Sequence, residues 1–128
     1  NDTTRNVAHI HVAHSSMQWF GWQDFGVPSK SSYDIVKELC DVMIRTVADG
    51  KGIVIHCSAG IGRTGTILAI VDAMRIINAG DFADLSIFKL VYNLRMHRYG
   101  SVQTVKQYQF IYAFLREYIK RGINPVKQ

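Results

Sequence analysis

The stretch His56-Cys57-Ser58-Ala59-Gly60-Ile61-Gly62-Arg63-Thr64-Gly65 decides how this chain is interpreted, because it joins two apolar segments of different character. Before it, residues 53–55 form a β-branched run that is typical of a buried strand. After it, residues 66–79 are almost wholly apolar, which predicts a buried helix. The glycines between them permit positive φ and close backbone approach, so successive N–H groups can point at one anion. The loop therefore suits a phosphate group.

The pair Cys57 and Arg63 indicates nucleophilic chemistry at this loop. A free thiol has a pKa of about 8.5, and a helix N-terminus with an adjacent guanidinium lowers that pKa toward neutrality. Cys57 would then be a thiolate nucleophile. Arg63 presents a planar fork of donors that matches two phosphoryl oxygens. The Thr64 hydroxyl is near enough in sequence to donate to the sulfur, and the His56 ring is placed to orient the loop.

Three other interpretations of the loop compete with this one. Residues 60–65 satisfy the Gly-x-Gly-x-x-Gly pattern of dinucleotide sites, but Asp81 follows the helix without the second strand such a site requires. A Walker loop would need a lysine where Thr66 stands. A plain strand-to-helix turn with a buried cysteine explains the glycines, although it leaves Arg63 beside an apolar helix unexplained.

The stretch 56–65 resembles the signature of the classical protein tyrosine phosphatases, and two further motifs follow that family's order. Trp22-Gln23-Asp24-Phe25-Gly26-Val27-Pro28 resembles the mobile loop that carries the general acid, usually written Trp-Pro-Asp. Residues 94–104, followed by Gln107-Tyr108, resemble the loop whose glutamine positions the hydrolytic water. The resemblance covers residues 1–128, which correspond to the C-terminal portion of a family catalytic domain; we expect the N-terminal part to be missing.

The resemblance implies hydrolysis of phosphotyrosine in proteins. In the implied mechanism Cys57 attacks the phosphorus and Asp24 protonates the departing phenolate. Asp24 then acts as base on a water that Gln103 orients, with Gln107 assisting. The resemblance implies no metal and no cofactor.

The resemblance also assigns the phosphate-binding groups. Arg63 holds the equatorial oxygens together with the loop residues, which are Ser58, Ala59, Gly60, Ile61 and Gly62. Supporting roles fall to Trp22, His56, Thr64 and Gln107.

One position departs from the family pattern. Gln23 stands where proline is usual, so the acid loop loses a residue that restricts φ, and its closed state is less favoured. This leaves an alternative function: a catalytically silent domain of the same fold that binds phosphotyrosine or a protein partner.

Composition bounds the class of protein. The 128 residues are 48% hydrophobic and 11% aromatic, which suits one globular core. No apolar run reaches about 18 residues and nothing resembles a signal peptide. With Cys57 assigned to the loop, Cys40 is expected to be a packing residue rather than half of a disulfide, which suits a reducing compartment. We expect a cytoplasmic protein, or the cytoplasmic part of a receptor-type protein.

The hydrophobic pattern predicts an α/β fold, and the resemblance implies part of a phosphatase-like domain with a central twisted sheet flanked by helices. Strands are expected near residues 7–12, 17–22 and 53–55. Helices are expected near residues 34–48, 66–79, 85–97 and 105–120. The residues expected to face the core from the last helix are Tyr108, Ile111, Tyr112, Leu115 and Ile119.

Charge and histidine content suggest two further partners, neither of which we favour. Residues 86–128 hold eight Lys and Arg against Glu117 alone, but they show no nucleic-acid-binding motif. Attraction to anionic phosphopeptides is the better interpretation. His9, His11 and His14 lack the further ligands that zinc requires. The resemblance implies phosphotyrosine-containing proteins as the partners; we expect no nucleic acid, and no membrane contact is visible in this segment.

Overall fold

The computed structural model describes residues 7–12, 15–20, 33–50, 53–56, 62–97 and 99–121, and only the backbone within the strands. Strands and helices both occur, as the α/β prediction requires. In chain order the elements are β1 (Val7–Val12), β2 (Ser15–Phe20), α1 (Tyr33–Ala48), β3 (Ile53–His56), α2 (Gly62–Asn78), the 3-10 turn η3 (Phe82–Asp84), α3 (Ile87–His97) and α4 (Val105–Lys120).

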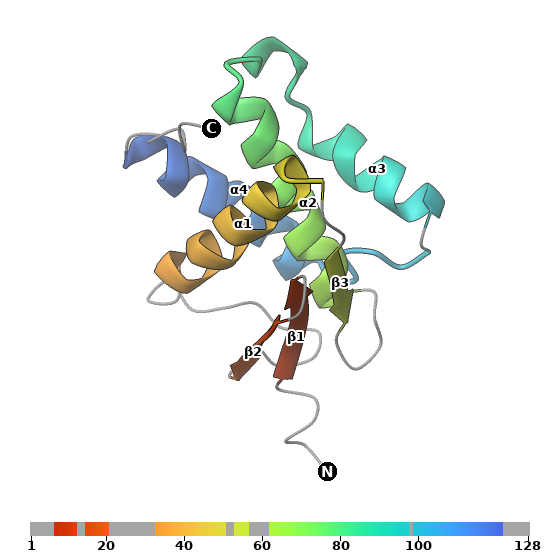
Figure 1. Cartoon of the computed structure of the whole chain (residues 1–128). Helices are drawn as coiled ribbons and strands as arrows, with labels where there is room; N and C mark the ends of the chain where they lie inside the picture. Colours follow the sequence, from red (N-terminus) through yellow and green to blue (C-terminus); the bar gives the residue numbers. More distant parts are fainter. Residues whose placement is uncertain are drawn as a thin grey trace.

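The three described strands form an antiparallel sheet in the order β2-β1-β3. Val12 pairs with Ser15 in β2, and His9 pairs with His56 at the end of β3. Figure 1 shows this sheet at one end of the molecule, with the helices gathered beyond it. A central sheet flanked by helices stays a prediction.

Helix α2 forms the centre of the core. It contacts α1, α3 and α4, and Figure 1 shows it running through the middle of the helical layer. Ala69, Ile70, Ala73 and Met74 on this helix are completely buried. A helix that is apolar on nearly all sides is stable only inside a core, which is what the sequence of this segment predicts. The first turn of α2, which contains Gly62 and Arg63, is therefore part of a helix fixed by packing on several sides.

Helix α2 begins earlier than predicted. It starts at Gly62, whereas the apolar pattern placed its start at residue 66. Gly62 and Gly65 are helical and do not adopt the positive φ that glycine permits; the positive-φ glycines in the described ranges are Gly50, Gly80 and Gly100. At Gly62 and Gly65 glycine is needed because neighbouring residues lie where a Cβ would be.

The buried face of α4 is rotated relative to its prediction. Ile111 and Leu115 are buried as expected, but Tyr112 and Ile119 are 42% and 41% exposed. Tyr33 of α1 explains the rotation, because its ring packs edge-on against two aromatic rings of α4, each with its centroid 5.5 Å away. Aromatic pairs of this edge-on geometry add a favourable contribution beyond the apolar area that they bury. The residues that actually face the core are Gln107, Phe110, Ile111, Phe114, Leu115 and Tyr118.

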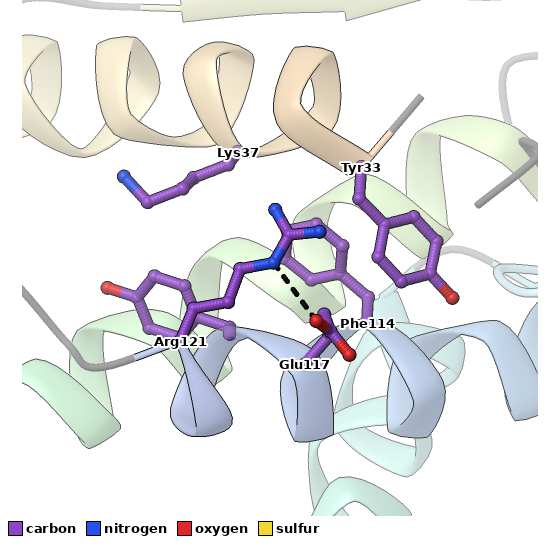
Figure 2. Close-up of a pocket in the computed structure, with 6 residues that line it drawn as sticks. Tyr33, Lys37, Phe114, Glu117 and Arg121 are labelled. Atoms are coloured by element: carbon purple, nitrogen blue, oxygen red, sulfur yellow. Dashed lines mark hydrogen bonds and ion pairs between the residues drawn. The ribbon is translucent and has the colours of Figure 1, made fainter. Parts of the chain in front are cut away.

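Polar side chains lie at the surface of the α1–α4 interface, where Figure 2 shows Lys37 of α1 near Glu117 and Arg121 at the end of α4. Arg121 donates from Nε to Glu117 Oε2 at 3.0 Å and from Nη1 to Asp34 Oδ1 at 2.7 Å. Lys37 lies beside them and donates to Asp41 Oδ2 at 2.7 Å. Lys37, Glu117 and Arg121 border a small hollow of about 30 Å³ that no predicted site residue lines. We therefore interpret this hollow as part of the helix interface.

Candidate active site

The predicted site residues divide between the described and the undescribed parts of the chain. Gly62, Arg63, Thr64, Gln103 and Gln107 are described, as is the backbone of His56 at the end of β3. The predicted residues that lie outside the described ranges are Trp22, Asp24, Cys57, Ser58, Ala59, Gly60 and Ile61.

Arg63 is a buried cation at the start of α2. It is the second residue of that helix, and its side chain is only 1% exposed. Burying a guanidinium is costly unless anionic or polar groups surround it. The N-terminus of α2 adds a partial positive charge at the same place. Thr66 closes the first turn by donating to the carbonyl of Gly62 at 2.8 Å. The Arg63 guanidinium and the partial positive charge of the helix N-terminus both favour an anion at the first turn of α2.

Gln103 lies against this helix start, although it is far from it in sequence. A Cβ placed on Gly62 would overlap Gln103 Oε1 and would lie 3.0 Å from Gln103 Cδ. Gln103 Oε1 is buried and accepts no hydrogen bond from the residues that the structure describes. The fold thus brings a glutamine amide to the turn that carries Arg63. The role of Gln103 in orienting water stays a prediction.

Gln107 holds the backbone next to Gln103. Its Oε1 accepts from the N–H of Gln103 at 2.8 Å and from the N–H of Thr104 at 3.3 Å. In return Thr104 Oγ1 accepts from the N–H of Gln107 at 3.0 Å, which completes a capping box at the start of α4. The prediction of Gln107 as a water ligand stays a prediction. Sequence reasoning missed Thr104, although the Thr-x-x-Gln spacing of a capping box could have found it.

Two further residues that sequence reasoning did not assign contact the Gln103 loop. Arg95 of α3 donates to the carbonyls of Ser101 and Val102, at 2.9 and 2.6 Å. Gly65 of α2 lies so close to Ser101 that a Cβ there would be 2.7 Å from Ser101 Cβ. No sequence pattern announces hydrogen bonds to backbone carbonyls, so the Arg95 contacts required the tertiary structure.

A cavity of about 390 Å³ is lined by residues of α3 and of the segment that leads into α4, Gln103 among them. Arg95 contributes the only formal charge of its lining, which is otherwise largely aromatic and aliphatic. The lining residues are Phe88, Val91, Tyr92, Arg95, Gln103, Thr104, Val105 and Tyr108. Gln103 therefore lines this cavity and also lies against Gly62 at the start of α2.

Metal and membrane sites were also considered for the described part of the chain. In residues 33–50, 62–97 and 99–121, no three His, Cys, Asp or Glu side chains are grouped so that they could hold a metal ion. Within the described residues, none of the helices combines the length and the apolar character needed to span a bilayer. Cys40 is a free cysteine, completely buried in α1, so its predicted packing role is confirmed.

Comparisons with known proteins identify the family to which the chain is similar. The family model described as protein-tyrosine phosphatase matches residues 1–117. The Caenorhabditis elegans tyrosine-protein phosphatase non-receptor type ptp-2 is 37% identical over 122 residues, which are 85% of this chain and 18% of that protein. The Arabidopsis thaliana protein-tyrosine-phosphatase PTP1 is 39% identical over 111 residues, which are 87% of this chain and 30% of that protein.

A solved structure shows the same relationship at the level of the fold. The crystal structure of the Trypanosoma brucei protein tyrosine phosphatase TbPTP1 superposes with a TM-score of 0.69 at 31% identity. The match covers 98% of this chain and 47% of that chain. The chain thus spans less than half the length of each of these three proteins.

Proposed function

The chain belongs to the protein-tyrosine phosphatase family, and from this premise we propose that it hydrolyses phosphotyrosine in proteins through a cysteinyl phosphate. One observation carries the proposal. Arg63 is buried in the first turn of α2, and the amide of Gln103 lies against Gly62 in that same turn. This pairing supports a two-step phosphoryl transfer, in which Arg63 binds the phosphoryl oxygens and the Gln103 amide orients the attacking water.

The first step transfers the phosphoryl group to sulfur. The Cys57 thiolate attacks phosphorus, the S–P bond forms, and the bond from phosphorus to the phenolic oxygen breaks. Asp24 supplies the proton that the departing oxygen takes up. Arg63 and the backbone N–H groups of residues 58–62 hold the three equatorial oxygens. The positive end of α2 and the buried guanidinium both favour the thiolate over the thiol.

The second step returns the enzyme to its starting state. The oxygen of a water molecule attacks phosphorus, the S–P bond breaks, and the electron pair returns to the sulfur of Cys57. Asp24 accepts the proton of that water and inorganic phosphate leaves. Gln103 Oε1 accepts a hydrogen bond from the attacking water, while Gln107 holds the backbone of Gln103. Thr64 donates to the departing sulfur, and His56 and Trp22 orient their loops.

The proposal extends to the context of the chain. Residues 1–128 form the C-terminal portion of a catalytic domain whose central twisted sheet is flanked by helices. Its substrates are phosphotyrosine-containing proteins rather than nucleic acids, and it uses neither a metal nor a cofactor. It acts in the cytoplasm, either alone or as the cytoplasmic part of a receptor-type protein. The names of the relatives and the eight basic residues in 86–128 support the choice of an anionic phosphoprotein.

The test compares the two cysteines in the protein expressed from its full reading frame. We expect Cys57→Ser to abolish hydrolysis of a phosphotyrosine peptide while binding of that peptide stays measurable by titration calorimetry. Cys40→Ala is the matched control, because Cys40 is buried in α1 and has no part in the mechanism. Turnover by Cys57→Ser close to that of the wild type would refute the proposal. A wild-type protein that binds the peptide without hydrolysing it would instead establish the silent, phosphotyrosine-binding alternative.

A further inference from the structure

We propose that Arg95 is a positioning residue for the second step, because it sets the conformation of loop 99–104 and thereby the place of Gln103. The inference rests on the proposed function and deepens it. Arg95 itself contacts no reacting group in this scheme, and it acts through the loop backbone.

The contacts of Arg95 are directed at two successive carbonyls. From the last turn of α3, its Nε donates to the carbonyl of Ser101 at 2.9 Å and its Nη2 donates to the carbonyl of Val102 at 2.6 Å. Hydrogen bonds from a charged donor are stronger than neutral ones. The planar guanidinium presents both donors in one fixed fork, which a lysine cannot reproduce. Arg95 therefore fixes the orientation of two peptide units that precede Gln103.

The conformation that these bonds hold is a strained one. Val102 has a φ of 59°, in the left-handed region that a β-branched side chain rarely adopts. Its side chain is completely buried. Strained backbone of this kind persists only where surrounding contacts over-determine it, and it is concentrated at functional sites. Because Val102 directly precedes Gln103, relaxation of its φ would redirect the Gln103 side chain.

Helix α2 also contacts loop 99–104, through Gly65. A Cβ on Gly65 would lie 2.7 Å from Ser101 Cβ and 2.8 Å from the backbone nitrogen of Val102, so the loop rests directly on the helix backbone. Gly62, which touches Gln103, lies three residues earlier and hence on the same face of α2. Residues Ser101 and Val102 of the loop thus contact both the Arg95 guanidinium and the backbone of α2 at Gly65. Gln103 is consequently placed relative to the anion-binding turn.

The chemistry assigns the effect to one step. Formation of the cysteinyl phosphate uses Cys57, Arg63 and Asp24, and it requires no water. Its breakdown forms a P–O bond to water and breaks the S–P bond, and only this step uses the amide of Gln103. Loss of the Arg95 contacts should therefore slow the breakdown of the intermediate and leave its formation nearly unchanged.

The experiment separates the two steps in the protein expressed from its full reading frame. We compare wild type, Arg95→Gln and Arg95→Lys on a chromogenic aryl phosphate, by stopped-flow and steady-state kinetics. A misplaced water-orienting group lowers the rate roughly 10- to 100-fold. We expect kcat of Arg95→Gln to fall by that factor, kcat/KM to stay within about twofold, and a burst of phenol to precede the steady state. Arg95→Lys, which retains one donor, should be intermediate.

A matched control removes the same charge elsewhere. Lys89→Gln changes an exposed side chain of the same helix that makes no hydrogen bond or ion pair with the loop among the described residues, and it should behave like wild type. Equal reductions of kcat and kcat/KM in Arg95→Gln would mean a structural loss of active protein and would overturn the inference. Unchanged kinetics would overturn it as well.

A second measurement does not depend on turnover. We expect the side-chain amide resonance of Gln103, assigned through Gln103→Ala, to shift in the ¹⁵N spectrum of Arg95→Gln. An unchanged resonance would overturn the inference. A wild-type protein without turnover would refute the proposed function, whereas this resonance would still decide whether Arg95 positions Gln103. If Arg95→Gln fails to fold, the same spectrum of Arg95→Lys makes the comparison.

Discussion

Gln103 and Gly62 lie in contact although they belong to different parts of the fold. Gly62 is the first residue of α2, and Gln103 directly precedes the N-cap of α4. A Cβ on Gly62 would overlap Gln103 Oε1 and would approach Gln103 Cγ to 3.1 Å. The missing side chain at Gly62 is therefore what allows the Gln103 amide to reach the turn that carries Arg63.

This contact predicts different outcomes for two glycine substitutions. In Gly62→Ala the overlap is with the end of a flexible side chain, so Gln103 swings away, and we expect turnover to fall with little change in Tm. In Gly65→Ala the overlap includes the backbone of Ser101 and Val102, and such overpacking costs about 1–3 kcal/mol. We therefore expect Gly65→Ala to lower both turnover and Tm. Thermal melts and steady-state kinetics on a phosphotyrosine peptide measure the two effects. Wild-type turnover in Gly62→Ala would show that this contact has no catalytic importance.

The sequence predicts elements best where the hydrophobic pattern is regular. The bounds of β1 and α4 agree with the predicted residues 7–12 and 105–120. Strand β2 begins at Ser15 rather than at residue 17, because its pairing with β1 extends to the pair Val12 and Ser15. Helix α2 begins four residues early because glycine, arginine and threonine in its first turn interrupt the apolar pattern, while close contacts still hold that turn helical.

The candidate site is predictable from the sequence only where a motif specifies the side chain. Motif spacing predicts Gln103 and Arg63, because their chemistry requires particular side chains. The roles of Gly65 and Arg95 depend on where a distant loop packs, and they involve backbone atoms that carry no residue identity. The capping box of Thr104 and Gln107 could have been predicted, because its two residues are close in the chain and follow a known sequence pattern.

The hydrogen bond between Tyr118 and Asn78 predicts a measurable contribution to stability. Tyr118 is 5% exposed, and its hydroxyl donates to Asn78 Oδ1 at 2.6 Å, which joins α4 to the end of α2. We expect Tyr118→Phe to lower the free energy of unfolding by about 1 kcal/mol. Tyr112→Phe is the control, because Tyr112 is exposed and its hydroxyl lies 3.3 Å from that of Tyr108. Urea denaturation of both variants gives the comparison, and equal losses would contradict the assigned role of Tyr118.

Cys40 predicts a pH dependence of stability. Burial raises the pKa of the Cys40 thiol, and the neighbouring Asp41 carboxylate raises that pKa further. The folded state thus keeps the thiol protonated, whereas the unfolded chain ionises it near pH ~8.5. Above that pH the unfolded state binds fewer protons, so the free energy of unfolding decreases as the pH rises; below it this contribution is fully present. Urea titrations of wild type and Cys40→Ala between pH 7 and about 10 measure the difference. The slope attributed to Cys40 should vanish in Cys40→Ala, and a persisting slope would assign it to other groups.

The last prediction concerns Gln23 and Asp24 in the proposed acid loop. Glutamine in place of proline enlarges the set of conformations open to the loop, so the closed state that brings Asp24 to the leaving oxygen is less populated. We expect Gln23→Pro to raise kcat on a phosphotyrosine peptide and to leave kcat nearly unchanged on an activated aryl phosphate, whose leaving group scarcely needs a proton. Asp24→Asn should remove that difference and the basic limb of the pH profile, because no acid remains to be deprotonated. Paired steady-state kinetics on both substrates for wild type and the two variants measure these effects. Unchanged peptide turnover in Asp24→Asn would exclude Asp24 as the general acid, whereas unchanged turnover in Gln23→Pro would exclude only the effect of glutamine on loop closure.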